Sequence, residues 1–204
     1  MIPDSLTIRE REDWLLDRGF NPKSIANRWI TSNTYAPIEI MEVCYNYITH
    51  ELGLDTKVFK KNPFVFHLSI EDNLKPKVEY ITQELGLDAK VFEKNPQLFN
   101  LSIEDNLKLK YHYLTTEMHT NNFALEKFPV AFSLSLKKRI IPRWEFAKTK
   151  GKSNITLSNL LSPNDKNFAK KMGSDTAHYH QFRDNLNDFI EETYASLVTV
   201  VTSP

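Results

Sequence analysis

The chain has 204 residues, of which 41% are hydrophobic and 25% charged, and its 26 basic residues equal its 26 acidic ones. This composition supports a packed core and excludes wholesale disorder. No stretch approaches the roughly 18 apolar residues of a membrane span, and the opening residues lack the apolar segment of a signal peptide. Cys44 is the only cysteine, so disulfides within the chain are excluded.

The sequence repeats with a period of 33 residues. The segment LSIEDNLKPK begins at Leu68, and LSIEDNLKLK begins at Leu101. The same spacing aligns Pro63 with Pro96 and Pro129, Ser69 with Ser102 and Ser135, Leu74 with Leu107 and Ile140, and Tyr80 with Tyr113 and Phe146. A fainter copy, LDRGFNPKSIANRW, precedes these units, and another begins at KTKGKSNITLSNLL. A fixed period of this length indicates a solenoid, whose units bury their apolar faces by stacking on one another.

Each unit begins with a long helix. In the unit that starts at Lys75, Pro76 suits a first helical turn, and Val78, Ile81 and Leu85 follow at helical spacing. Gly86 can adopt the left-handed conformation that ends such a helix. We therefore predict long helices that begin near Pro76, Lys110 and Pro142.

A short helix and a short turn complete the unit. Asp88 is placed to cap a second helix from Ala89 to about Lys94, which Pro96 interrupts. Ser102 starts one more turn, with Asp105 three residues later in the pattern of a capping box. No segment alternates as a strand does, so we predict an all-α superhelical solenoid whose units each contain a long helix, a short helix and a short 3-10 turn.

The end of the chain departs from the repeat. We predict one closing helix over about 177–198, whose stripe of Phe182, Leu186 and Phe189 docks on the last unit as a solenoid cap. The expected division is a repeat array over 1–172 and a capping helix with a tail over 173–204. The final FIEETYASLVTVVTSP also has an alternative interpretation, as the Glu-rich C-terminal secretion signal of a bacterial effector.

Three segments carry a resemblance to a known family. They are VFKKNPFVFHLSIEDNLKPKVEYITQELGL, VFEKNPQLFNLSIEDNLKLKYHYL and LEKFPVAFSLSLKKRIIPRWEFA. Each resembles the mitochondrial transcription termination factor (mTERF) family in its proline after an apolar pair, its Leu-x-x-Ser-(Leu/Ile) and its step into a long helix. The segment LSNLLSPNDKNFAKKM also looks like the one that closes many members. The resemblance implies a curved superhelix of three-helix units and, in studied relatives, binding of double-stranded DNA or structured RNA in organelles.

The neutral total charge conceals a segregated distribution. Residues 134–172 contain ten basic and two acidic residues, whereas 173–204 contain one arginine and five acids. Lys77, Lys110 and Arg143 share one repeat position, and Lys61, Lys94 and Lys127 share another. Repetition would turn each set into a row of cations, which is what contact with phosphates needs. The predicted nucleic-acid-binding residues are Lys77, Lys110, Lys137, Lys138, Arg139, Arg143 and Lys148.

Two functions of different classes remain open, and the family resemblance together with the basic segment 134–172 leads us to favour the first. The first is a protein that binds double-stranded DNA or RNA and acts in transcription or RNA maturation. The second is a protein-binding solenoid that holds a partner on its concave face, which includes a secreted bacterial effector. Helix surfaces also carry lysine and glutamate merely for solubility, so the charged rows do not decide between the two.

We expect no enzymatic activity, because nothing resembles a nucleophile elbow, a phosphate loop or a paired-carboxylate cleft. We also expect no metal, no cofactor, no small-molecule substrate and no membrane partner. His178 and His180 are the nearest approach to a metal pair, and we interpret them as part of a solvated turn. The sequence leaves the location open between an organelle, the bacterial cytoplasm and secretion.

Overall fold

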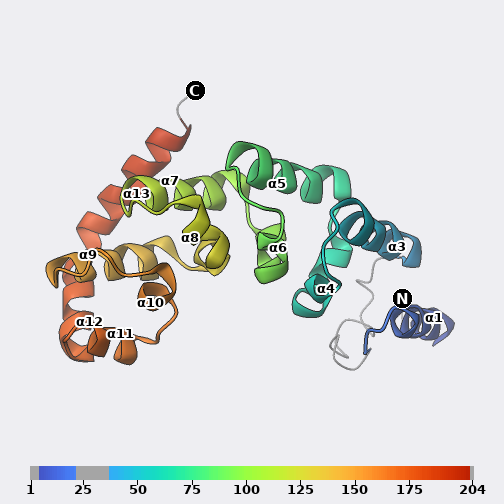
Figure 1. Ribbon diagram of the computed structural model, residues 1–204, viewed down its shortest axis with the longest axis horizontal. Helices are drawn as coiled ribbons and strands as arrows, with labels where there is room; N and C mark the ends of the chain where they lie inside the picture. The colour runs from blue at the N-terminus through green and yellow to red at the C-terminus, as the bar shows by residue number, and fades with distance from the viewer. Residues whose placement is uncertain (1–4, 22–36, 203–204) are drawn as a thin grey trace. The chain divides into compact units, whose positions relative to one another are not determined.

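The computed structural model describes residues 5–21 and 37–202, which form helices and turns without any strand (Figure 1). The all-α prediction is therefore confirmed. The chain divides into two compact units, an N-terminal unit (Met1–Glu84 and Asp88–Asn100) and a C-terminal unit (Leu85–Leu87 and Leu101–Pro204). Most of the fainter first repeat, LDRGFNPKSIANRW, lies outside the described residues. Within the described ranges, no helix has the length and apolar content that a membrane crossing needs.

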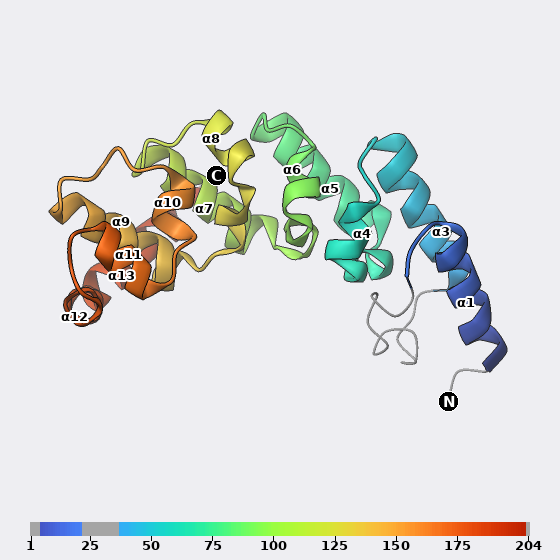
Figure 2. The same ribbon diagram turned by 60° about the horizontal axis from the view of Figure 1, so that its bottom comes forward.

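The described residues of the N-terminal unit form five α-helices together with 3-10 and π turns, which are labelled η (Figure 2). Their bounds are α1 (Ser5–Asp17), α3 (Ile38–Asn46), η1 (Tyr47–Glu51), α4 (Lys57–Lys61), η2 (Pro63–His67), η3 (Ile70–Leu74), α5 (Lys75–Glu79), η4 (Tyr80–Glu84), α6 (Val91–Lys94) and η5 (Pro96–Asn100). The π turns adjoin α-helices directly, so η3, α5 and η4 form one long helix.

The C-terminal unit continues the pattern and then departs from it. Its elements are η6 (Ile103–Lys108), α7 (Leu109–Thr116), α8 (Asn122–Lys127), η7 (Pro129–Ser133), η8 (Leu136–Ile140), α9 (Ile141–Thr149), α10 (Leu157–Leu161), α11 (Asp165–Lys171), α12 (Thr176–Asn185) and α13 (Asn187–Thr202). The short helices α10 and α11 follow α9, whereas α12 and α13 have no counterpart in the repeat.

The repeats whose long helices begin at Ile70 and Ile103 have the predicted order of a long helix, a short helix and a 3-10 turn, whereas two short α-helices follow the long helix in the last repeat. The long helices begin six or seven residues earlier than predicted. Ser69, Ser102 and Ser135 are the N-caps of these long helices, and each side-chain oxygen accepts a hydrogen bond from the backbone N–H three residues later. The turn predicted to stand alone at Ser102 is thus the first turn of the long helix. The 3-10 turn lies instead at the repeated proline.

The core follows the repeat. Leu74, Leu107 and Ile140 are each fully buried, as their shared position predicts. Aromatic pairs repeat as well: Phe59 stacks on Phe66 with ring centroids 4.2 Å apart, and Phe92 stacks on Phe99 at 4.1 Å. The period of the apolar residues therefore identifies the buried face of each helix correctly.

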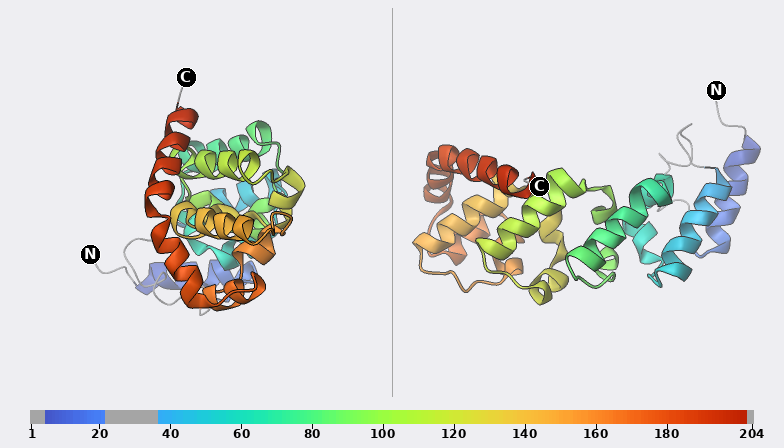
Figure 3. Two further views of the ribbon diagram at one scale, coloured as in Figure 1. Left: turned by 90° about the vertical axis from the view of Figure 1, so that its left-hand side faces the viewer. Right: turned by 90° about the horizontal axis from the view of Figure 1, so that it is seen from above.

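The closing segment differs from its prediction. Two helices, α12 and α13, replace the single expected helix, and they meet at Leu186, whose φ of −92° and ψ of 0° interrupt the helical path. Phe182 packs on Phe146 with ring centroids 5.1 Å apart, but Phe189 is 43% exposed. Ile190 and Leu197 are the buried residues of α13, which crosses the long helices of the C-terminal unit (Figure 3).

Candidate nucleic-acid interface

The predicted row of Lys77, Lys110 and Arg143 is not on the surface. The exposed fractions of these residues are 8%, 6% and 0%. The prediction that they contact phosphates is therefore wrong in this structure, since a buried side chain presents no charge to a partner. Helical geometry explains the burial, because each residue lies three positions after a fully buried core residue (Leu74, Leu107 or Ile140) and on the same helical face.

Two of these cations instead bind backbone carbonyls within the C-terminal unit. Lys110 donates from Nζ to the carbonyl oxygen of Phe132 at 2.5 Å. Arg143 donates from Nη1 to the carbonyls of Leu160 at 3.0 Å and Leu161 at 3.2 Å. These carbonyls lie at or near the ends of η7 and α10, where the helix dipole favours a positive charge. The cation at this repeat position thus links α7 to η7 through Lys110, and α9 to α10 through Arg143.

Burial also lowers the pKa values of the two lysines. Removal from water lowers the pKa of Lys77, whose Nζ donates to Asn73 Oδ1 at 2.6 Å. The same effect lowers the pKa of Lys110 to about 8. Both lysines are largely buried and hydrogen-bonded within their own compact unit, so they contribute to its structure.

The cluster of Lys137, Lys138 and Arg139 lies in η8, next to α13. Lys137 Nζ contacts Glu191 at 2.5 Å and lies 4.2 Å from the ring centroid of Tyr194, so the closing helix neutralises it. Lys138 is exposed and Arg139 is partly exposed. Their contact with nucleic acid stays a prediction, whereas Lys137 is already engaged.

Lys148 is the remaining predicted residue. Its side chain is 45% exposed, and its Nζ lies 2.8 Å from Glu145 Oε2 in the same helix. An exposed pair of this kind contributes little stability and can exchange partners readily. Lys148 therefore remains available to a phosphate, but its charge is partly balanced.

A different set of cations gathers at the short helices of the C-terminal unit. We call this set the lysine face, and its members are Lys127, Lys148, Lys152, Lys170 and Lys171. All five are exposed. They line three adjoining depressions: Asn154 and Ile155 border the first and the second, and Asn159 borders the second and the third.

Most partners of the lysine face are neutral. Lys152 Nζ donates to the backbone carbonyl of Lys171, and Lys171 Nζ donates to Asn159 Oδ1 at 2.8 Å. Lys127 Nζ lies 4.1 Å from the ring centroid of Phe123. Neutral partners hold these ammonium groups in place without cancelling their charge. The residues that line the three depressions include one carboxylate, Glu117.

A family model described as mTERF matches residues 57–169, which is more than half of the chain. The chain belongs to the mTERF family. Membership indicates a nucleic-acid-binding helical repeat protein that acts in transcription. A comparison with curated proteins returned no match. The matched residues include Lys127, Lys148 and Lys152, whereas Lys170 and Lys171 follow directly after them.

No group of three potential metal ligands occurs among the residues of this mTERF protein that the structure describes. His178 and His180 lie in α12, and not in a solvated turn as the sequence suggested. His180 Nε2 is 3.1 Å from Asp165 Oδ2, and Arg143 Nη2 is 2.8 Å from Asp165 Oδ1. Burial raises the pKa of Asp165, but these two bonds outweigh it and lower the pKa overall. This network joins α9, α11 and α12 of the mTERF repeat region and its closing helices.

The lysine face was not identified from the sequence, because the predicted site rested on the repeat position of Lys77, Lys110 and Arg143, which is buried. The second set in the sequence, Lys61, Lys94 and Lys127, lies in the last turns of α4, α6 and α8, and all three residues are exposed. Lys170 and Lys171 occupy the last turn of α11 in the same way. Basic residues in the last turns of α4, α6, α8 and α11 were the available signal in this mTERF sequence, since that position complements the helix dipole. The signal does not extend to Lys148 and Lys152, which lie in the long helix α9 and in the loop after it.

Proposed function

We propose that the chain binds the phosphate backbone of double-stranded DNA or structured RNA through its lysine face, and that it acts in transcription or RNA maturation. The observation that carries this proposal is the lining of the three depressions, where five exposed lysines accompany a single carboxylate. Each neutralised phosphate releases condensed counterions, and this release supplies most of the sequence-independent affinity.

The composition of the face favours backbone contact over base reading. It contains lysine and no arginine, and bidentate recognition of guanine relies mainly on arginine. Lysine contacts to phosphate position a protein on nucleic acid without reporting the base sequence. Specificity would then come from other groups or from the shape of the nucleic acid.

Two matched charge reversals test the proposal. The first double variant, Lys170→Glu with Lys171→Glu, reverses two adjacent charges on the lysine face. The second, Lys138→Glu with Arg139→Glu, reverses two adjacent charges in η8, so both variants change the net charge of the protein equally. The assay is binding to generic duplex DNA and RNA over a range of salt concentrations. With five contacts on B-DNA, the logarithm of the affinity should fall with the logarithm of salt at a slope of about −4 to −5.

We expect the Lys170/Lys171 reversal to weaken binding to all sequences and to make the slope less steep by about 2. The η8 pair should have the smaller effect. A larger loss of affinity in the η8 variant would indicate that the interface lies at Lys138 and Arg139 instead. Negligible binding by the unaltered protein at low salt would reject nucleic-acid binding altogether.

A protein partner remains the second candidate function. It is favoured by exposed apolar side chains on two helices of the N-terminal unit, where Leu16 of α1 is 56% exposed, and Ile40 and Val43 of α3 are 51% and 57% exposed. Ile40 and Val43 lie three positions apart on one face of α3, and adjoining exposed apolar side chains are typical of surfaces that another protein covers. If the duplex assay fails, Leu16, Ile40 and Val43 are the residues to alter when a protein partner is sought.

A further inference from the structure

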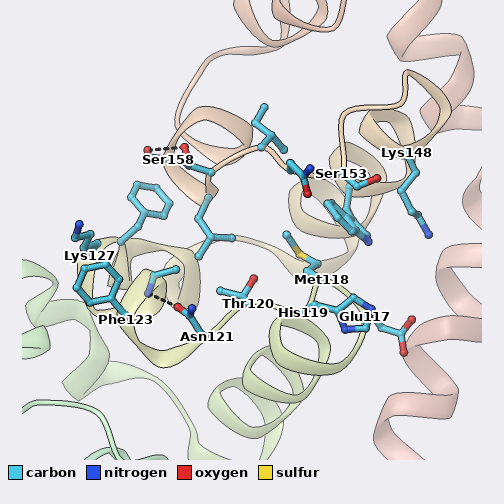
Figure 4. A pocket seen from close by; sticks show the side chains of 17 residues that line it. Glu117, Met118, His119, Thr120, Asn121, Phe123, Lys127, Lys148, Ser153 and Ser158 are labelled. Carbon is cyan, nitrogen blue, oxygen red and sulfur yellow. Dashed lines mark hydrogen bonds between the residues drawn. The ribbon is translucent and has the colours of Figure 1, made fainter.

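A depression of about 900 Å3 in the C-terminal unit lies between the end of α7, α8, α9 and the segment before α10. Figure 4 shows Phe123 and Lys127 at one end of it, with His119 and Lys148 at the other and Thr120 between them. Its volume lies within the range of small-ligand sites, roughly 300–1,000 Å3. The whole depression belongs to one unit, so its walls are held by the contacts of that unit.

The lining departs from the repeat at His119. The two preceding units have Gly53 and Gly86 at the same position, both with positive φ. His119 keeps that backbone conformation, with a φ of 51°, and it is the only non-glycine residue with positive φ in the described ranges. A side chain in this conformation costs stability that glycine would not, so its presence calls for a reason.

Two further departures follow within four residues. Position 121 holds Asn121 where the other units hold Asp55 and Asp88. Asn121 still caps its helix, since its Oδ1 accepts from the backbone N–H of Ala124 at 2.9 Å, but it does so without a negative charge. Position 123 holds Phe123 where the other units hold Lys57 and Lys90.

Phe123 is an unusual residue for its position. Its side chain is 64% exposed, which makes it the most exposed large hydrophobic residue among those that the structure describes. Lys127 Nζ lies against one side of its ring, at 4.1 Å from the centroid. The three replacements together remove a carboxylate and an ammonium group, add an imidazole and expose an aromatic ring, all at the rim of one depression.

We propose that this depression binds an unpaired nucleotide, with the base stacked on Phe123 and the phosphate held by Lys127 beside it. This inference rests on the proposed function and deepens it, because it assigns a base-contacting site next to the backbone-contacting lysines. An exposed aromatic ring beside a cation is the arrangement that single-stranded nucleic acids recognise, since every base has a face that can stack. Glu117 lies at the His119 end, so the phosphate belongs at the opposite end, beside Lys127.

The substitution Phe123→Lys gives a sharp test, because it restores the residue of the other two units and adds a positive charge. If the site acts by charge alone, Phe123→Lys should bind nucleic acid more tightly. If Phe123 stacks on a base, the variant should bind a short single-stranded oligoadenylate about tenfold or more weakly. Phe123→Trp keeps a stacking surface and should retain the binding.

The probes are the oligoadenylate, free AMP and generic duplex DNA, each titrated by calorimetry. If Phe123→Lys weakens the binding of AMP and of oligoadenylate equally, a single free nucleotide is sufficient to occupy the site. If the variant weakens the binding of oligoadenylate alone, the ligand of the site is a nucleic-acid strand. Duplex affinity should stay the same or rise slightly, because the variant gains a cation on the face. The matched control is Phe64→Lys, which makes the same change at a residue of the N-terminal unit that is 41% exposed.

Failure of this inference is distinguishable from failure of the proposed function. Oligoadenylate binding that is unchanged or stronger in Phe123→Lys would overturn the nucleotide site, and so would an equal loss in Phe64→Lys. Duplex binding that persists in either case would leave the lysine face standing. An exposed Phe123 that serves a protein contact would give the same result, with oligoadenylate and AMP insensitive to the substitution. The melting temperatures of the variants confirm that each remains folded.

Discussion

The guanidinium of Arg143, which has no exposed surface, lies 2.8 Å from the carboxylate of Asp165. The two residues come from α9 and α11, so the pair links the last long helix to the last short helix of the mTERF match. The same arginine also binds two carbonyls of α10 and lies 4.8 Å from the ring centroid of Phe168. Its role is to hold three elements together.

Removal of Asp165 should therefore destabilise the protein. We expect Asp165→Ala to lower the free energy of unfolding by about 2–4 kcal/mol, because it leaves Arg143 buried without a counter-charge; the partial exposure of Asp165 moderates the effect. The double variant with Arg143→Met should be less destabilised than the sum of the two single variants. Chemical denaturation of all four proteins measures this coupling, and simple additivity would contradict it.

Lys110 should make stability depend on pH in the alkaline range. Burial lowers its pKa from 10.5 to about 8, so between these values the unfolded chain binds more protons than the folded chain. The contribution of Lys110 to stability therefore rises with pH across this window, by roughly 1–3 kcal/mol, and is smallest below pH 8.

The measurement is the difference in free energy of unfolding between the natural protein and Lys110→Met from pH 7 to pH 10.5. Tyr113 lowers the stability as the pH rises above 10, because burial raises its pKa. Since Tyr113 is present in both proteins, its contribution cancels in the difference. A difference that does not change with pH would show that Lys110 keeps its charge in the folded state.

The positive φ of His119 leads to a pair of opposite substitutions. His119→Gly should raise the free energy of unfolding by about 0.5–1 kcal/mol, since it relieves a left-handed backbone at a helix end. Gly86→Ala should lower it by about 1 kcal/mol at the equivalent position. A Cβ at Gly86 would meet Asn122 Nδ2 at 3.6 Å, an ordinary contact, so the cost there is conformational. Thermal melts that change in the same direction for both variants would refute this explanation.

Neighbouring residues of α13 test how the closing helix docks. Ile190 is 4% exposed and Phe189 is 43% exposed. We expect Ile190→Ala to cost about 2–4 kcal/mol through lost burial and a residual cavity. Phe189→Ala should change stability by about 0.5 kcal/mol or less. If the two variants melt alike, α13 is not held by the contacts described above.

The repeat period allowed much of the fold to be predicted, because a buried face recurs wherever the unit recurs. Leu74, Leu107 and Ile140 show this directly, since one alignment identified three fully buried residues. The extent of the long helices was predicted less well. Pro76 suggested a helix start there, whereas the helix capped by Ser69 begins six residues before Pro76, at Ile70. The break at Leu186 has no signal in the apolar pattern.

The same period misled the choice of site. Periodicity indicates that Lys77, Lys110 and Arg143 are equivalent, but it does not indicate which way they face. Their spacing from Leu74, Leu107 and Ile140 places them on the core side, and a cation there is held by backbone carbonyls that the sequence alone does not position. The exposed lysines at the ends of the short helices required the three-dimensional arrangement of loops and depressions before they could be grouped.

The buried cation at this repeat position has a consequence for the engineering of such arrays. A consensus unit is usually written with the core residues fixed and every charged position free to vary. Treated in that way, the position of Lys110 would accept glutamate, which would bury a carboxylate against the carbonyl oxygen of Phe132. A designed array of these units should therefore hold lysine or arginine at this position as firmly as it holds leucine in the core.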